Sequence, residues 1–268
     1  MSLTSPTVDP TFEHTTAVTP DPDVPGRFHA HYDEGWASLR GIHGGYQTAV
    51  AVRAAEAMSP GRAVRTISAS FLRPGAIGPA VLDATVVRTT RTFTTVLVTV
   101  SQLDRPILTV RTTANEPVEG HDWSTPSDDG PCPLPEAVSF TPPPEVRHFR
   151  QADLLLDPTT IPTGDADEAR IAGYVRPKAG NVIDAAWLVM AGDWFPPSPF
   201  RRVELPIGGV SVDYTVHVHH TVTLGPDEWL AAVFTTPTST AGLALEHGRL
   251  MTLDGQPVAE TFHTRWTG

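Results

Sequence analysis

The sequence predicts an α+β fold built from two copies of one unit, in which a curved antiparallel sheet wraps a central helix. In the first copy, Gly44-Gly45 open an Ala/Val-rich run typical of a buried helix, and a strand-like segment follows at 67–71. A second run begins near Gly180-Asn181, continues through 183–193, and reaches a strand-like segment at 210–214. A unit that is present in two copies, and not in many, indicates two fused copies of one domain rather than a solenoid.

Both expected helices are apolar on nearly every side. Arg53 and Glu56 interrupt the first, whereas 185–191 carries no polar group except the indole N–H of Trp187. Such a helix is buried on most sides, as one enclosed by a sheet must be. Asp184 stands at the start of the second helix, where an acidic residue is favoured, and we interpret it as structural.

Segments dense in Val, Ile, Thr and Leu, separated by turns, predict the strands of the two sheets. The turn between the last two segments contains Asp254-Gly255, and this pair predicts a hairpin because it tolerates positive φ. The expected strands span 81–87, 93–103 and 106–113 in the first copy, and 214–224, 229–236, 241–253 and 257–266 in the second.

Composition along the chain sets the domain boundaries. Residues 1–26 are rich in Thr, Pro and Asp without periodicity, and we expect them to form an N-terminal arm. The first domain is expected over 27–115 and the second over 165–268. Between them, the proline-rich stretch 116–164 suits neither a central strand nor a long helix, so we expect a linker there.

The charge balance excludes several classes of partner. Lys and Arg number 19 against 30 Asp and Glu, for a net charge of -11, which repels nucleic-acid phosphates and anionic lipid surfaces. Cys132 is the only cysteine, so neither an intramolecular disulfide nor a cysteine-based metal cluster can form. The sequence has no leader-like or membrane-spanning apolar run. We therefore expect a cytoplasmic protein that binds neither nucleic acid nor membranes.

Five short motifs together point to one family. They are Gly44-Gly45, 70–75 (Ser-Phe-Leu-Arg-Pro-Gly), 191–194 (Ala-Gly-Asp-Trp), 211–214 (Ser-Val-Asp-Tyr) and Asp254-Gly255 before a closing strand. This set resembles the acyl-CoA thioesterase II family, the TesB-like double hotdog proteins, over roughly 30–115 and 165–268. The resemblance implies a double hotdog fold that forms an intramolecular pseudo-dimer. It also implies hydrolysis of an acyl-CoA to free acid and coenzyme A, within lipid metabolism.

The resemblance further implies a set of catalytic residues. In the family, an Asp after the second helix, a Thr or Ser on the next strand and a Gln on the last strand hold the attacking water. These positions fall on Asp193, Ser211 and His263. Water attack on a thioester needs a base and donors for the oxyanion. The last position departs from the family pattern, because histidine replaces glutamine.

The surroundings of Asp193 support a special role independently of the family. A carboxylate at the C-terminal end of an apolar helix is disfavoured by the helix dipole, and here Trp194-Phe195 follow it. Desolvation would raise the pKa of Asp193 and make it a stronger base. The alternative interpretation is a solvent-facing aspartate where the helix ends before Pro196-Pro197.

His263 also has several interpretations, of which the plainest is a hydrogen-bonded core or surface residue on a strand. An imidazole could orient the water or replace Asp193 as the base, because its ordinary pKa lies close to neutrality. Alternatively, the change from glutamine removes the water site and leaves a non-catalytic protein that binds acyl-CoA or fatty-acyl groups.

The expected substrate-binding residues lie at the start of the first helix. The N–H groups of Gly44 and Gly45 suit an oxyanion or a pantetheine carbonyl, although glycines there could serve only close packing. His43 and Tyr46 are adjacent, and we expect them to line the acyl tunnel.

We expect neither a metal nor another cofactor. His217 and His219 share a strand face at a spacing able to chelate zinc, but the sequence offers no identifiable third ligand. The run 192–196 is similar to the Asp-x-x-Pro-x-His element of hotdog enoyl-CoA hydratases, yet Ser198 stands where that element needs histidine, which disfavours hydration. The sequence leaves a homo-oligomer open.

Overall fold

One large antiparallel sheet dominates the computed structural model, which describes residues 11–178, 183–203, 209–220, 225 and 228–268. Within these residues the sheet has thirteen strands, and a second sheet has two short strands. Together with the helices α2 (Gly44–Ala57) and α3 (Ala185–Ala191), this is the predicted α+β class. The expected start of the second copy near Gly180-Asn181 and the end of the 214–224 segment lie outside the described residues.

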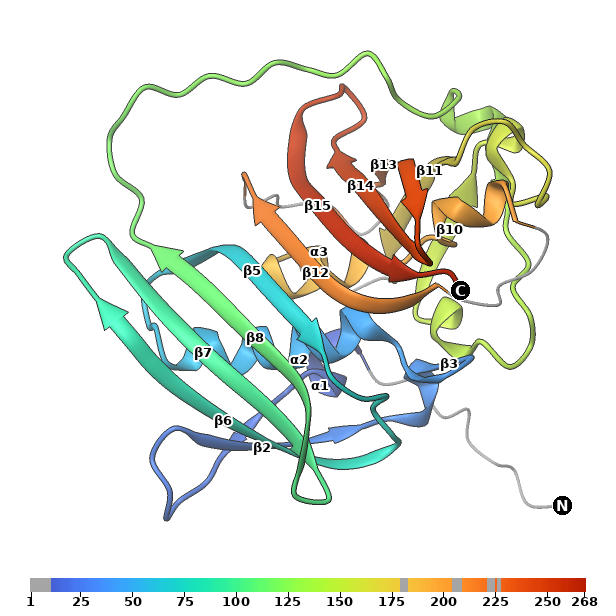
Figure 1. Ribbon diagram of the computed structural model, residues 1–268. Helices are drawn as coiled ribbons and strands as arrows, with labels where there is room; N and C mark the ends of the chain where they lie inside the picture. Colours follow the sequence, from blue (N-terminus) through green and yellow to red (C-terminus); the bar gives the residue numbers. More distant parts are fainter. Residues whose placement is uncertain (1–10, 179–182, 204–208, 221–224, 226–227) are drawn as a thin grey trace, which may run out of the picture.

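The large sheet consists of two halves with the same strand order (Figure 1). The first half runs β2-β6-β7-β8-β5 and the second runs β11-β13-β14-β15-β12, with α2 and α3 each following the first strand of its half. β5 and β12 pair antiparallel, with Tyr214 opposite Ala69, and so join the halves. The strand bounds are β2 (Arg27–Tyr32), β5 (Ala63–Phe71), β6 (Gly78–Thr89), β7 (Phe93–Gln102), β8 (Arg105–Asn115), β11 (Arg170–Pro177), β12 (Val210–Val218), β13 (Leu230–Thr240), β14 (Leu243–Met251) and β15 (Pro257–Trp266).

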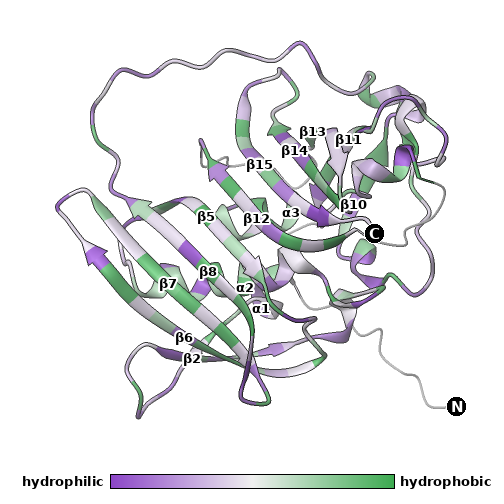
Figure 2. Cartoon of the chain, viewed as in Figure 1, coloured by the Kyte–Doolittle hydropathy of each residue, from purple (hydrophilic) through white to green (hydrophobic). Residues whose placement is uncertain are grey.

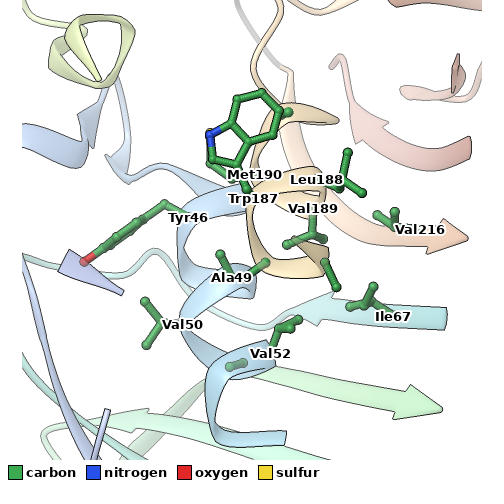
Figure 3. Packing of buried hydrophobic residues seen from close by; sticks show 14 of the residues in the cluster. Tyr46, Ala49, Val50, Val52, Ile67, Trp187, Leu188, Val189, Met190 and Val216 are labelled. Carbon is green, nitrogen blue, oxygen red and sulfur yellow. The ribbon is translucent and has the colours of Figure 1, made fainter. Parts of the chain in front are cut away.

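The two helices pack against each other and against the strands at the junction of the halves. Every residue of α3 is buried, as its apolar sequence predicted. Side chains of both helices, among them Val50 and Val189, belong to one core with Ile67 of β5 and Val216 of β12 (Figure 3). Asp184 caps α3 by accepting the N–H of Trp187 at 2.9 Å, which confirms its structural interpretation.

The strands show the alternation expected of a sheet with one covered face (Figure 2). In β7, for example, Val96, Val98 and Val100 are fully buried, whereas Phe93 and Leu97 are exposed. All seven strand segments predicted from sequence correspond to observed strands. The hairpin turn at Asp254-Gly255 is also confirmed, with Gly255 at φ +84.

Besides the shorter strands, β2 and β11 have no counterpart in the sequence-based prediction. In β11, residues 171–175 are all buried, which hides the period-two pattern that marks a half-covered strand. The strand lies between β13 and β10, and the 3-10 helices η4 (Pro158–Thr160) and η5 (Ser198–Arg201) also contact it. Covering on both faces therefore concealed this element.

The stretch 116–164 contains more structure than a linker requires. Its strands β9 (Val138–Ser139) and β10 (Ala152–Leu156) extend the edge of the large sheet beyond β11, where a proline-rich segment is tolerated. It also carries the 3-10 helices η2 (Leu134–Glu136) and η3 (Arg147–Arg150). η3 contacts η1 (Glu34–Trp36), so this stretch packs against the first half of the chain.

The described part of the N-terminal arm lies against the first half. It contains α1 (Phe12–Thr15) and β1 (Thr19–Pro20), which pairs with β2. Phe12 is buried and its ring meets Trp36 edge to face at 5.8 Å. The two strands of the small sheet, β3 (Ala37–Ser38) and β4 (Gly41–Ile42), then lead into α2.

Candidate active site

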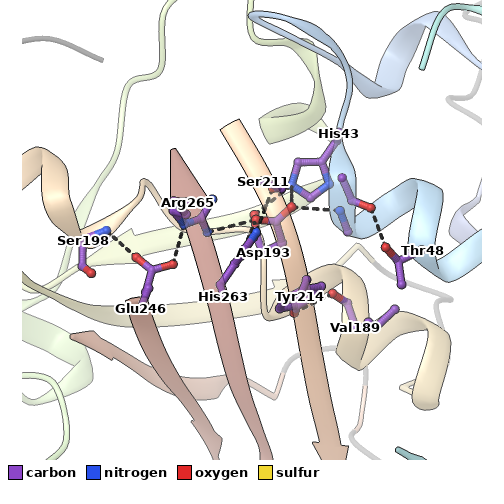
Figure 4. A network of polar contacts seen from close by, with 12 residues as sticks. His43, Thr48, Val189, Asp193, Ser198, Ser211, Tyr214, Glu246, His263 and Arg265 are labelled. Atoms are coloured by element: carbon purple, nitrogen blue, oxygen red, sulfur yellow. Dashed lines mark hydrogen bonds and ion pairs between the residues drawn. The ribbon is translucent and has the colours of Figure 1, made fainter. Parts of the chain in front are cut away.

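The carboxylate of Asp193 lies at the centre of a buried polar cluster between the two helices and β15 (Figure 4). Asp193 follows Gly192, the C-cap of α3, and is 8% exposed. Its Oδ2 accepts the backbone N–H of Gly45 at 2.8 Å, and its Oδ1 accepts Nη2 of Arg265 at 3.0 Å. The solvent-facing alternative for Asp193 is therefore wrong.

His263 lies between Asp193 and Ser211. Its Nε2 is 2.8 Å from Oγ of Ser211, and its Nδ1 is 3.4 Å from Oδ1 of Asp193. His263 is 1% exposed and shares the inner face of β15 with Arg265. The structure thus brings together the three residues that the sequence singled out as catalytic.

A β-bulge gives Ser211 its orientation. The register of β12 against β15 shifts between Ser211 and Asp213, so that Val212 and Asp213 are consecutively exposed. Strict alternation from the buried Tyr214 would turn Ser211 outward, whereas the bulge allows its hydroxyl to reach His263 on the inner face. No sequence pattern indicated this bulge.

Arg265 and Glu246 are members of the cluster that sequence reasoning missed. Nε of Arg265 donates to Oε1 of Glu246 at 2.7 Å, and Oε2 of Glu246 accepts the N–H of Ser198. Both side chains are almost fully buried, which charged groups tolerate only when they are paired. The available signal was the i, i+2 spacing of His263 and Arg265, which places both on one strand face.

His43 and the two glycines at the start of α2 lie in the site. Nδ1 of His43 accepts the N–H of Tyr46 at 3.2 Å, so Nε2 carries the proton and donates to the backbone carbonyl of Asp193 at 2.8 Å. Gly44 lies beside the carboxylate, but the N–H of Gly45 is already bound to it. Of the two, only Gly44 keeps an N–H without a partner among the described residues.

Tyr46 does not line the cavity beside the cluster. Its ring stacks on Trp36 at 4.4 Å, and its hydroxyl donates to the carbonyl of Thr15 at 2.7 Å. The side chain is fully buried in the core instead. Adjacency in sequence placed it with His43, but successive positions on a helix point in different directions.

Gly45 permits the close approach of the two helix ends. A methyl group at this position would lie 2.9 Å from Cβ of Asp193 and 3.0 Å from the carbonyl oxygen of Met190. We expect Gly45→Ala to lower the free energy of unfolding by about 1–3 kcal/mol, because neither helix end can move without disturbing the core. Urea unfolding would measure this loss. Gly120→Ala is the control, because a methyl group there meets open space, and equal stability of the two variants would contradict the prediction.

The pKa of Asp193 is lowered, not raised. Burial alone would raise it, but the imidazoles of His263 and His43, the Arg265 guanidinium and the Gly45 N–H outweigh burial and hold the pKa well below its usual range. The expectation from sequence is therefore wrong, because it counted desolvation without these neighbours. Asp193 is ionised at neutral pH and is a weak proton acceptor.

Three buried histidines are neutral at neutral pH. Burial lowers the pKa of His43 and brings the pKa of His148 and of His263 well below the ordinary value. Arg265 lowers the pKa of His263 further, and Asp193 offsets only part of this effect. A neutral imidazole retains one nitrogen lone pair, which a general base requires.

A cavity of about 620 Å³ adjoins the cluster, a size typical of small-molecule sites. Ser211, Gly44, Asp193 and Arg265 all contribute to its wall. The stretch expected to be a linker contributes as well, through 140–149. The remaining wall is rich in aromatic side chains, namely Phe71, Phe140, Phe149, Phe195, Phe200 and Trp266.

The described residues offer no metal site, since no three His, Cys, Asp or Glu side chains are grouped to hold an ion. The ring of His217 packs edge to face on Phe262, and Nε2 of His219 lies 3.6 Å from Oε2 of Glu260. In the part of the chain that the structure describes, no helix combines the length and apolarity of a membrane span.

Two sequence profiles match almost the whole chain. The profile of the acyl-CoA thioesterase N-terminal domain matches residues 32–115, and that of the acyl-CoA thioesterase C-terminal domain matches residues 117–266. The curated protein sequences contain no match to the chain.

Solved structures share the architecture over their full length. A putative thioesterase II from Thermobifida fusca YX is 25% identical, with a TM-score of 0.85 over 97% of this chain and 99% of that one. A conserved protein with a hot dog fold from Alicyclobacillus acidocaldarius is 19% identical, with a TM-score of 0.84 over 96% and 97% of the two chains. An acyl-CoA thioesterase II from Mycobacterium marinum is 18% identical, with a TM-score of 0.74 over 96% and 98%. The chain therefore has the hot dog fold, belongs to the acyl-CoA thioesterase family and is a thioester hydrolase.

Proposed function

We propose that the protein hydrolyses an acyl-CoA thioester to free acid and coenzyme A in the cavity beside Asp193. One observation carries this proposal. Asp193 and His263, both buried, and the half-buried Ser211 form a continuous chain of polar groups that borders a cavity with many aromatic and other apolar side chains. A charged chain of this kind is costly to bury, and such clusters are most often kept at functional sites.

Within this site, Asp193 orients the base, and His263 is the base. The Asp193 carboxylate already accepts one hydrogen bond from the backbone N–H of Gly45 and one from the Arg265 guanidinium. Its lowered pKa also makes it a poor proton acceptor. It instead holds the proton of His263 on Nδ1, which leaves the lone pair of Nε2 facing Ser211. The substitution of histidine for the family glutamine thereby supplies a base to the site.

The start of α2 provides the group that stabilises the oxyanion. Gly44 lines the cavity, and its N–H is one of the unpaired donors at the helix N-terminus, where the dipole favours negative charge. A thioester carbonyl that points toward this N–H would develop its negative charge there. His43, which caps the helix and donates to the backbone of Asp193, fixes the helix end relative to the base.

The cavity wall indicates the substrate class. Its aromatic side chains suit an apolar acyl group, which gains free energy as it leaves water. The exposed residues Arg40 and Arg73 also belong to the wall, and guanidinium groups suit the phosphates of coenzyme A.

We also infer that the chain arose by tandem duplication and forms an intramolecular pseudo-dimer of two hotdog domains over 27–115 and 165–268. The identical strand order of the two halves and the β5–β12 junction support this inference. The site lies between the halves, since Gly44 and His43 come from the first and the other members of the cluster from the second.

Thiol release from acyl-CoAs of several chain lengths tests the proposed function, with Asp193→Asn assayed beside the wild-type protein. We expect release by the wild-type protein and a rate about 10- to 100-fold lower for the variant, because the orienting charge is lost. Equal rates would remove Asp193 from the mechanism. Thermal stabilisation by acyl-CoA without any thiol release would instead identify a non-catalytic binding protein.

A further inference from the structure

We propose that Ser211 is a nucleophile and that hydrolysis passes through an ester between the acyl group and its Oγ. The proposal rests on the proposed function and adds a covalent step to it. The order of groups carries it: the Asp193 carboxylate, then the His263 imidazole, then the Ser211 hydroxyl. This order of acid, imidazole and hydroxyl activates a serine on several unrelated folds.

The contacts of His263 leave one path for a proton. Nδ1 faces Oδ1 of Asp193 at 3.4 Å and has no hydrogen-bond partner among the described residues. The carboxylate on that side favours the tautomer with the proton on Nδ1, which leaves the lone pair of Nε2 for Oγ of Ser211, 2.8 Å away. A proton taken up by His263 must come from Ser211, because a water molecule would first have to displace that hydroxyl.

The contacts of Ser211 favour attack over the holding of a water. Its hydroxyl has His263 as its one side-chain partner within the described residues, so the imidazole is positioned to take its proton. Ser211 also lines the cavity, which places its oxygen where an acyl group would lie. The bulge at Val212 turns this side chain inward, out of the alternation of the strand, and bulges often re-aim side chains beside active sites.

The covalent route balances in two steps. In the first, Oγ attacks the thioester carbon, its proton passes to Nε2 of His263, the C–S bond breaks, and the coenzyme A thiolate takes that proton. In the second, water attacks the Ser211 ester, gives its proton to Nε2, and the C–Oγ bond breaks as Oγ recovers the proton. The net reaction is thioester and water to acid and thiol, with no other reactant.

Two measurements on the intact protein test the nucleophile. A fluorophosphonate probe, which labels activated serines, should modify Ser211 in the wild-type protein, with little labelling of His263→Ala and none at this position in Ser211→Ala. Rapid quenching after mixing with acyl-CoA, followed by intact mass spectrometry, should show an adduct of acyl mass. Ser211→Ala should lose the adduct and lower kcat about a thousandfold or more. Ser68→Ala on β5 is the matched control, because that hydroxyl does not contact His263, and it should behave as the wild-type protein.

The outcomes separate the nucleophile from the proposed function. An unlabelled wild-type protein, or Ser211→Ala that releases thiol within tenfold of the wild-type rate, would overturn the nucleophile and leave the hydrolase intact. Labelling of Ser211 without thiol release from any acyl-CoA would support the nucleophile and overturn the proposed substrate. Thermal unfolding of each variant would show that it is folded, and Ser211→Cys, which keeps a nucleophile, should still form the acyl adduct.

Discussion

Replacement of His263 with alanine is expected to lower kcat for thioester hydrolysis by about 10²- to 10⁴-fold, the usual contribution of a general base. Nε2 of His263 is the ring nitrogen that contacts the Ser211 hydroxyl in the site, and the Asp193 carboxylate is held by Arg265 and Gly45. Asp193 therefore cannot take over the role. Steady-state thiol release gives the rate, and thermal unfolding shows whether the variant is folded.

His263→Gln is a sharper comparison, because it restores the residue that the family pattern carries at this position. This variant loses the effect of His263, but His43, Arg265 and the N–H of Gly45 remain and continue to lower the pKa of Asp193. We therefore expect His263→Gln to be as slow as His263→Ala. His217→Ala is the control, since that ring packs on Phe262 away from the cluster. Wild-type activity in His263→Gln would show that Asp193 activates water directly.

The second large effect is a loss of stability in mild acid. The pKa of each of His43, His148 and His263 lies below its ordinary value in the folded protein, because burial disfavours the charged ring. Below about pH 6.5 the unfolded chain binds protons that the folded chain does not, so the free energy of unfolding falls as the pH falls. Each histidine lowers the free energy of unfolding by at most about 1.4 kcal/mol per pH unit, so the three together lower it by at most roughly 4 kcal/mol per pH unit.

Asp193 acts in the same direction at lower pH. Its pKa is depressed in the folded state, so its contribution is present above the unfolded value of about 3.9 and is lost as the pH falls below it. Urea unfolding at pH 7.5, 6 and 5 would measure the histidine effect before Asp193 titrates. In His148→Phe, the free energy of unfolding should depend less steeply on pH, because unfolding takes up about one proton fewer. A free energy of unfolding that stays constant from pH 7 to 5 would contradict the account.

The two helices and the main strands of the fold were predictable from the sequence because local composition and tertiary environment agree there. The run 185–191 is apolar on all sides and is buried on all sides, and the Val/Thr-rich segments form the strands that they predict. The fold prediction missed strands such as β11, where burial of both faces removes the alternation. An edge position likewise allowed β10 to form within a stretch whose prolines argued for a linker.

The site was predictable only in part, for a physical reason. Asp193, Ser211 and His263 were identified one at a time, from a family pattern. The sequence alone predicts that Arg265 and Glu246 are each exposed, because a lone charged side chain in a strand normally faces water. They are buried only because each neutralises the other across β14 and β15. The groups around Asp193, namely His263, His43, Arg265 and the N–H of Gly45, reverse the pKa shift expected for it, so the direction of that shift could not be derived without their coordinates.

The most direct measurement is a structure of the protein with a non-hydrolysable acyl-CoA analogue, in which a methylene group replaces the thioester sulfur. The account predicts that the carbonyl carbon lies about 3–3.5 Å from Oγ of Ser211, the separation typical of a reactive arrangement, with its oxygen directed at the N–H of Gly44. The acyl chain should lie among Phe71, Phe195 and the other aromatic side chains of the cavity. An analogue bound with its carbonyl remote from Ser211 and His263, or bound outside this cavity, would contradict the account.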